Sequence, residues 1–420
     1  MLCIRQRGKE VIISRLQGHK PTKGHSENNL MLKVDEALGI IENIKVNQEV
    51  TSGFVSPELK GFVVAEKVVA PFDIPSFNQS SVDGYAIKHH EAISYKIIGE
   101  VKAGSDVEFN LKSGEGVRIF TGAKIPIHTD SVVMQEYIQI KGAFIENNQA
   151  LQMGQNIRKI GSQIKKNTVV METGHLINPA SLGILQSLGI QQIKLFQKPR
   201  VSIVLTGNEL IKSGEELTEG KIFESNSIVL QSALNQFDIE NIDIRYSQDS
   251  FEETKQAIGE ALKDSDIVLI SGGISVGDYD FVKDSLDALG VEKLFHNVCQ
   301  KPGKPLYFGR LNDTYVFGLP GNPASTLNCF YIYVSIILEK FLQKTVIQKC
   351  LLPLSHDIEN KTERALFLKS KIKNNTVENI DENNSATLLS FSNADALAYI
   401  PSDCKKLKKG EELLCWLIPK

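Results

Sequence analysis

In the stretch DIVLISGGISVGDYDF, residues 266–281, an apolar run leads directly into a glycine turn, which is the clearest indication of the fold. The run DIVLI has the length and β-branched composition of a buried strand. Gly272 and Gly273 follow it and can present backbone N–H groups to an anion such as phosphate. Asp278 and Asp280 come a few residues later and would repel a bare anion. The ligand of this turn must therefore satisfy both kinds of group.

Strands and helices alternate regularly around this stretch, from residue 199 onward. The expected strands are VSIVL, IENIDIRY, DIVLI, EKLFHNV and TYVFGL. The expected helices include SNSIVLQSALNQF, SFEETKQAIGEALKD and FVKDSLDALG. Such alternation predicts an α/β domain with a largely parallel sheet that helices cover on both faces.

The remainder of the chain lacks this regular alternation of strands and helices. An amphipathic helix is expected over residues 33–46, and a second helix begins near Pro179. Short β-rich runs fill residues 60 to 150, and short strands return after residue 345. These changes over 420 residues predict a multidomain protein of the α/β plus β class. Residues 1–30 lack periodicity and are expected to be an ill-ordered extension.

The composition is that of a soluble globular protein, with 42% hydrophobic and 23% charged residues. A formal net charge of -3 gives no global field that would attract nucleic acid or a membrane. No apolar run approaches the roughly 20 residues that span a bilayer. The six cysteines lie far apart without a C-x-x-C pair, which is typical of reduced thiols in a cytoplasmic protein.

The loops after the expected strands indicate where a ligand binds, because open α/β sheets bind ligands beyond the carboxyl ends of their strands. TGNE (206–209), QD with Asp249, SGG and PGNPAS (320–325) each follow an expected strand. KPGKP (301–305) precedes the last strand. The sequence therefore predicts a ligand site along one edge of the sheet.

These loops divide into groups that suit phosphate and groups that suit a cation. The residues expected to contact phosphate are Gly272, Gly273, Ser275, Lys301, Gly303, Lys304, Gly321 and Ser325. The acids on the same edge are Glu209, Asp249 and Asp280. They suit Mg²⁺, which binds through few carboxylates plus substrate phosphate. The alternative is that each acid caps a helix or is a solvated charge. P-loop, dinucleotide-binding and serine-hydrolase fingerprints are absent.

Six motifs taken together resemble the molybdopterin molybdenumtransferase (MoeA) family, to which the catalytic E domain of gephyrin also belongs. The motifs are PSFNQSSVDGYAI, RIFTGAKIP, LTGNEL, SGGISVGDYDF, KPGKPLYFG and GLPGNPAS, in this order. The resemblance covers residues 31–420. SGG and PGNP also occur in molybdopterin-adenylylating relatives, but those are a single α/β domain long and lack the DGYA module.

The resemblance implies four domains and a homodimer. A helical or mixed domain over residues 31–70 and 150–197 is interrupted by a β-rich domain over 71–149, which carries DGYA. An α/β molybdopterin-binding domain over 198–345 and a C-terminal β-barrel-like domain over 346–420 follow. In the implied dimer, the site joins the α/β domain of one subunit to the DGYA domain of the other.

The resemblance further implies the reaction and its residues. Adenylylated molybdopterin and molybdate would react with the help of Mg²⁺ to give molybdenum cofactor and AMP. The positions that match the family's functional acids and threonine are Asp83, Thr121, Glu209, Asp249 and Asp280, and the metal ligands among them are Glu209, Asp249 and Asp280. Further substrate-binding positions are Pro320, Gly321, Asn322 and Pro323, with Lys369 and Ser385 near molybdate. Other implied partners are a molybdopterin adenylyltransferase and apo-molybdoenzymes. Without the resemblance, Asp83 would be interpreted as a turn residue.

The sequence departs from the family pattern at several positions. Lys369 replaces an arginine, which exchanges a bidentate fork for a point charge. Asn208, Asn156 and Gln163 replace aspartates, and His128 stands where glycine is common. The main acids are retained, so activity is expected.

Two other functions fit parts of the sequence. A molybdopterin adenylyltransferase would use the same α/β domain with ATP, but the additional β-rich modules argue against it. A non-catalytic scaffold would retain the fold, as gephyrin also clusters receptors, but no long linker or appended domain supports this function. The transferase is the leading interpretation.

Overall fold

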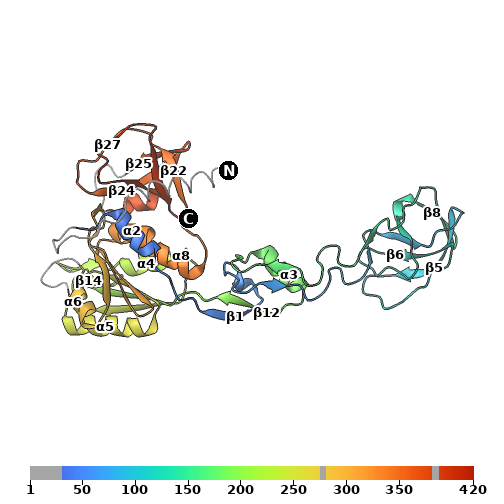
Figure 1. The fold of residues 1–420 in the computed structure, drawn as a ribbon, viewed down its shortest axis with the longest axis horizontal. Coiled ribbons are helices and arrows are strands. Elements are labelled where there is room, and N and C mark those ends of the chain that lie inside the picture. Colours follow the sequence, from blue (N-terminus) through green and yellow to red (C-terminus); the bar gives the residue numbers. More distant parts are fainter. Residues whose placement is uncertain (1–30, 275–280, 381–386) are drawn as a thin grey trace. The chain divides into compact units, whose positions relative to one another are not determined.

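The computed structural model describes residues 31–274, 281–380 and 387–420. They form two compact units. Unit 1 combines the residues up to Thr51 with Phe196–Lys420, and unit 2 comprises Ser52–Leu195. The chain enters and leaves unit 2 through β1 (Val50–Phe54) and β12 (Gln192–Phe196), which pair with each other. Figure 1 labels several elements of each unit.

A six-stranded sheet forms the centre of unit 1, in the order β16–β13–β17–β21–β20–β18. Its strands are β13 (Val201–Thr206), β16 (Ile242–Ser247), β17 (Ile267–Ser271), β18 (Glu292–His296), β20 (Tyr307–Leu311) and β21 (Thr314–Leu319). The first four strands in the sheet order are parallel. Every residue of β13 and β17 is buried, as expected for strands that are covered on both faces. The predicted α/β architecture is confirmed.

The sheet is largely parallel, as expected, and β20 is the strand that runs against its neighbours. β20 runs antiparallel to β21, and β18 runs antiparallel to β20. The strand β20, with the sequence YFGRL, is missing from the sequence-based prediction because its short apolar run merges with the preceding glycine-proline loop. A tight turn at Asn312 and Asp313 joins β20 to β21, so the two strands must run in opposite directions.

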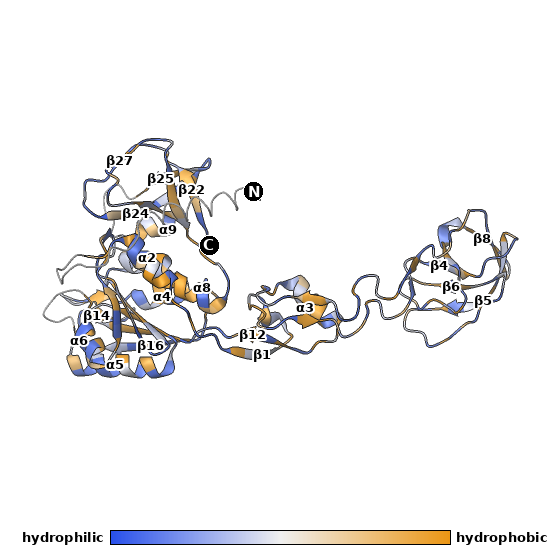
Figure 2. Cartoon of the chain, viewed as in Figure 1, coloured by the Kyte–Doolittle hydropathy of each residue, from blue (hydrophilic) through white to orange (hydrophobic). Residues whose placement is uncertain are grey.

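One face of the central sheet is covered by α5 (Phe251–Asp264) and α6 (Val282–Ala288). The buried residues of α5 recur at helical spacing and are Thr254, Ala257, Ile258, Ala261 and Leu262. Figure 2 shows hydrophilic residues along the same helix. This face forms a core with Val204 and Ile270 of the strands.

The other face is covered by α2 (Val34–Glu42), α4 (Asn226–Asn235), α7 (Pro323–Cys329) and α8 (Ser335–Leu342). Val34, Leu38 and Ile41 of α2 are buried in this core. The domain boundaries expected from the resemblance group α2 with residues 150–197 instead. The apolar stripe predicts the helix correctly, but a stripe does not show which core it joins.

A second six-stranded sheet in unit 1 uses the C-terminal residues, in the order β19–β24–β26–β28–β22, with β25 beside β24. Its strands are β19 (Gln300–Lys301), β22 (Lys349–Pro353), β24 (Ala365–Lys373), β25 (Thr376–Asn379), β26 (Ala396–Ile400) and β28 (Glu412–Leu417), with α9 (Leu388–Asn393) before β26. The rings of Phe367, Tyr399 and Trp416 on its strands pack against one another in stacked and edge-on arrangements. β19 pairs in parallel with β24, so this sheet is attached to the KPGKP loop.

Unit 2 contains a third six-stranded sheet, in the order β7–β4–β6–β5–β9–β8. Its strands are β4 (Gly84–Ile87), β5 (Ser94–Val101), β6 (Glu115–Ile119), β7 (Ser131–Met134), β8 (Ile138–Lys141) and β9 (Phe144–Asn147). A separate core joins Leu59 and Val64 to Met171 and to Leu185 of α3 (Pro179–Ser187). Among the described helices of the protein, none combines the length and the apolar character needed to cross a membrane.

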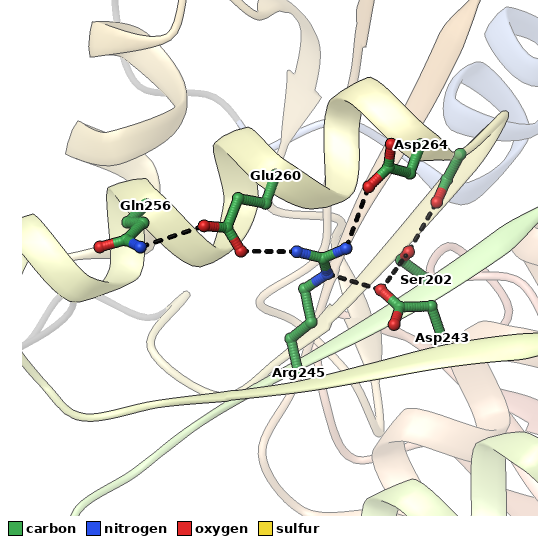
Figure 3. A network of polar contacts seen from close by, with 7 residues as sticks. Ser202, Asp243, Arg245, Gln256, Glu260 and Asp264 are labelled. Atoms are coloured by element: carbon green, nitrogen blue, oxygen red, sulfur yellow. Dashed lines mark hydrogen bonds and ion pairs between the residues drawn. The ribbon is translucent and has the colours of Figure 1, made fainter.

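An ion network ties the edge strand β16 to α5 (Figure 3). The Arg245 guanidinium on β16 donates to Asp243, to Glu260 at 2.6 Å and to Asp264 at 3.2 Å. Asp243 also accepts a hydrogen bond from the buried Ser202 hydroxyl of β13 at 3.0 Å. The network therefore holds β16 against α5. The loop that follows the C-terminal end of β16 carries part of the candidate site.

Candidate functional site

The predicted site loops lie at one edge of the central sheet. The parallel register places Ser271 at the end of β17 beside Leu319 at the end of β21. β20 begins at the same edge, because Tyr307 at its start pairs with Gly318. We call this edge the rim, and its described loops are residues 207–209, 248–249, 272–274, 301–305 and 320–325.

The turn after β17 has no room for side chains. Gly272 and Gly273 have φ angles of 94° and 57°, in the left-handed region that favours glycine. A Cβ on Gly272 would lie 2.5 Å from the carbonyl oxygen of Thr206, and a Cβ on either glycine would lie 2.9 Å from the Thr206 hydroxyl. Thr206 therefore packs directly against this turn. Its buried hydroxyl has no hydrogen-bond partner in the described part of the chain.

The loop after β21 leads into α7 and is capped by its own residues. The side-chain oxygen of Asn322 accepts from the backbone N–H groups of Ala324 at 3.1 Å and Ser325 at 3.2 Å. Pro323 occupies the first helical position, where no N–H is needed. The cap occupies the first free N–H groups of the helix. The backbone N–H groups of Gly321 and Asn322, which precede the helix, are the ones that a ligand would meet.

The KPGKP loop packs directly on α7. Gly303 has a φ of 82°, and a Cβ there would lie 2.6 Å from the sulfur of Cys329. The buried amide of Gln300 donates to the Gly303 carbonyl at 2.9 Å. Lys301 is exposed and Lys304 is half-buried. The backbone of this loop is therefore fixed, and its two lysines lie at the rim.

Glu209 and Asp249 lie on loops that follow the neighbouring strands β13 and β16. Asn208 ties these loops together, because its N–H donates to the Asp249 carboxylate at 2.9 Å and its side-chain oxygen accepts the Asp249 N–H at 3.1 Å. The exposed carboxylate of Glu209 folds back over Gly207. Within residues 31–274, 281–380 and 387–420, no group of three or more His, Cys, Asp or Glu side chains is arranged to hold a metal ion. Asp280, the third predicted ligand, lies outside the described residues.

Asn226, the first residue of α4, belongs to the rim although sequence reasoning missed it. Its side-chain nitrogen donates to the Ser271 hydroxyl at 2.8 Å and to the Gly321 carbonyl at 2.7 Å. Its side-chain oxygen is buried and lacks a partner among the described residues. The only signal in the sequence is a polar residue at a helix start that faces the sheet edge, which is too common to select it.

Asp83 and Thr121 meet each other in unit 2. One Asp83 carboxylate oxygen accepts from the Thr121 N–H at 2.7 Å and from its hydroxyl at 2.9 Å. These two bonds, the backbone one first, hold the pKa of the exposed Asp83 carboxyl below its ordinary value. The resemblance groups these residues as functional, and the structure shows them as a bonded pair.

Lys369 of β24 is fully buried inside the C-terminal part of unit 1. Its ammonium donates to the Thr387 carbonyl at 3.1 Å and to the Ser390 hydroxyl at 2.8 Å. The contact with molybdate suggested for Lys369 stays a prediction. Ser275 and Ser385 lie outside the described residues.

A cavity of about 270 Å³ opens at the opposite edge of the central sheet. Its lining includes Arg200, which precedes β13 and pairs with Asp266 at 3.0 Å, and Thr314 at the start of β21. None of the predicted site residues lines this cavity.

Three family models match the chain along most of its length. They are the MoeA N-terminal region (domain I and II) over residues 32–189, a "probable molybdopterin binding domain" over 202–340, and the MoeA C-terminal region (domain IV) over 352–418. The chain is 36% identical over 282 residues to a molybdopterin molybdenumtransferase of Haemophilus influenzae, covering 66% of this chain and 70% of the relative. It is 28% identical to the enzyme of that name from Staphylococcus epidermidis, covering 88% and 90%.

The fold is similar to that of a solved structure from Pyrococcus horikoshii, described as a molybdopterin biosynthesis MoeA protein. The TM-score is 0.74 at 30% identity, covering 93% of this chain and 100% of the other. The central α/β sheet, combined with two further six-stranded sheets, defines the class as a multidomain α/β plus β protein. The chain belongs to the MoeA family, and it is a transferase of molybdenum cofactor biosynthesis.

Replacing Gly272 by alanine is expected to lower the free energy of unfolding by about 1–3 kcal/mol, because the new Cβ meets a backbone oxygen at a positive φ. The matched control is Gly321→Ala, where a Cβ would meet only the Cα of Gly272 at 3.8 Å. We expect this control to stay within about 0.5 kcal/mol of the parent in urea unfolding. Equal losses of unfolding free energy in both variants would show that close packing of Thr206 against the turn is not the cause.

The carboxyl of Asp83 is expected to titrate below its ordinary pKa of 3.8 in the folded protein. Because the folded pKa is depressed, its contribution to stability is present above the unfolded pKa and is lost as the pH falls through the folded pKa. In Thr121→Val the backbone N–H remains and the hydroxyl is lost, so the pKa should return only part of the way. Carboxyl NMR titration measures both values, and a midpoint at or above 3.8 in the parent protein would contradict the assigned bonds.

Proposed function

We propose that the protein transfers molybdenum from molybdate to adenylylated molybdopterin and releases AMP. The observation that carries this proposal is the meeting of three glycine-containing loops from different strands at the rim, next to two lysines. Backbone N–H groups and ammonium groups suit the pyrophosphate of an adenylylated substrate. The names of the relatives, which are molybdopterin molybdenumtransferases, support the same substrate class.

The residues of the rim would bind and orient the substrate. The backbone N–H groups of Gly273 and Gly321 would donate hydrogen bonds to phosphate oxygens. Lys301 and Lys304 would compensate the negative charge that grows on the phosphates as water attacks the anhydride bond, which leaves one phosphate on the pterin and releases AMP. Held in this way, the substrate would keep a fixed orientation toward molybdate.

Glu209 and Asp249 fit a magnesium ion as partners of a bound pyrophosphate. Both are carboxylates on neighbouring loops, and the Glu209 carboxylate is exposed to the rim. Two carboxylates plus substrate phosphate make up a common magnesium ligand set, to which Asp280 would add a third carboxylate. When bound, Mg²⁺ would neutralise phosphate charge and polarise the anhydride bond.

The enzyme is proposed to act in the cytoplasm as a homodimer. In this dimer the Asp83–Thr121 pair of one copy would complete the rim of the other, as the resemblance implies. A molybdopterin adenylyltransferase would supply the substrate, and apo-molybdoenzymes would receive the product.

Replacing Glu209 by glutamine is expected to reduce turnover at least about tenfold without loss of stability, because an exposed acid contributes little packing. The assay supplies adenylylated molybdopterin, Mg²⁺ and molybdate, and measures AMP and the reconstitution of an apo-molybdoenzyme. The matched control is Glu216→Gln, which replaces another exposed acid in the segment between β13 and α4 and should retain full activity. Absence of molybdate-dependent AMP release by the parent protein would defeat the proposal, and ATP-dependent adenylylation of molybdopterin would favour the adenylyltransferase.

Two inactive variants are expected to restore activity when they are mixed. In a homodimer with shared sites, equal amounts of Asp83→Ala and Glu209→Ala give mixed dimers with one intact site, so about a quarter of the parent activity should return. The variants are unfolded together, refolded and assayed, with each variant treated alone as the control. A mixture no more active than its components would show that both residues act within one copy.

A further inference from the structure

The side chain of Asn226 joins two loops of the rim that come from different strands. One N–H of its amide donates to the Ser271 hydroxyl at 2.8 Å, and the other donates to the Gly321 carbonyl at 2.7 Å. The Ser271 hydroxyl in turn donates to the Pro320 carbonyl at 3.5 Å. A single amide group therefore fixes the end of β17 relative to the start of the loop before α7.

The helix that carries Asn226 is a rigid support for this contact. Leu230, Ala233 and Leu234 of α4 are buried in the main core of unit 1. Asn226 is the first residue of the helix, so its backbone is held by this packing and its side chain extends toward the rim. Direct backbone contact between the two loops is weak, since the N–H of Gly272 reaches the Leu319 carbonyl only at 3.4 Å.

We propose that Asn226 is a positioning residue that sets the spacing between the Gly272–Gly273 turn and the Gly321 loop, and thereby the binding of pyrophosphate. This inference rests on the proposed function, in which both loops face the phosphates of the substrate. The two loops must present their N–H groups to one ligand at the same time. A change in their spacing would therefore weaken binding even if each loop kept its own conformation.

Asn226→Asp separates this role from a role in helix stability. Aspartate has nearly the same shape, and a negative charge in the first turn favours the helix. The carboxylate has no N–H to donate, however, and it would face the Gly321 carbonyl with like partial charge. Pyrophosphate binding should fall while the helix is unharmed.

The matched control is Ser227→Ala, one residue further along the same turn. The Ser227 N–H donates to Glu224 at 2.8 Å, and its hydroxyl donates to the same carboxylate, so its contacts stay within the helix start. Losing a buried hydroxyl bond should lower the melting temperature and leave the spacing of the rim loops unchanged. The two variants thus have opposite expected patterns.

The experiment uses the full chain and three measurements: calorimetric binding of magnesium pyrophosphate, thermal unfolding, and hydrogen exchange of the amides of residues 319–326. For Asn226→Asp we expect the dissociation constant to rise about tenfold or more, with faster exchange in this segment. For Ser227→Ala we expect the dissociation constant to stay within about twofold of the parent value.

Two results would overturn the inference. One is parent-like binding and exchange in Asn226→Asp, and the other is weakened binding in both variants in proportion to their loss of melting temperature. If the parent protein binds no magnesium pyrophosphate, the proposed function fails for this ligand, and hydrogen exchange alone then decides the positioning role. Unchanged exchange in Asn226→Asp would overturn it in that case as well.

Discussion

The whole site depends on four parallel strands of unit 1 that end at the same edge of one sheet. Their register is fixed because alternate residues enter two separate cores, with Ile203 and Leu269 on one side and Val204 and Ile270 on the other. A shift of one strand by one residue against its neighbours would turn each of its side chains toward the opposite core, where it does not fit. Loops that are far apart in the sequence are therefore held next to one another, and each supplies only one or two groups to the site.

Local rules predict those parts of the site that depend on one segment at a time. Gly272 and Gly273 require the left-handed backbone that only glycine adopts easily, and PGNPAS contains its own helix cap, so both loops are evident from the sequence. Features that depend on which segments become neighbours are not evident. The direction of β20, the contacts of Asn226 and the core that α2 joins all follow from the assembled sheet.

Several departures from the family pattern have a structural explanation. His128 has a φ of 66°, the left-handed conformation in which glycine is strain-free, which accounts for the glycine common at this place. Asn208 uses its side-chain oxygen as an acceptor for the Asp249 N–H, a role that an aspartate would also fill. The Lys369 ammonium donates hydrogen bonds to Thr387 and Ser390 inside the C-terminal part of unit 1, so a single ammonium group fits this buried position.

A crystal structure of the protein with magnesium and adenylylated molybdopterin tests most directly whether the rim is the active site. If the rim is the active site, pyrophosphate oxygens will lie within hydrogen-bonding distance of the backbone at Gly273 and Gly321, with Lys301 or Lys304 beside them and the metal on Glu209 or Asp249. A ligand bound instead in the cavity of about 270 Å³ at the opposite edge, near Arg200, would contradict the assignment of the rim as the active site.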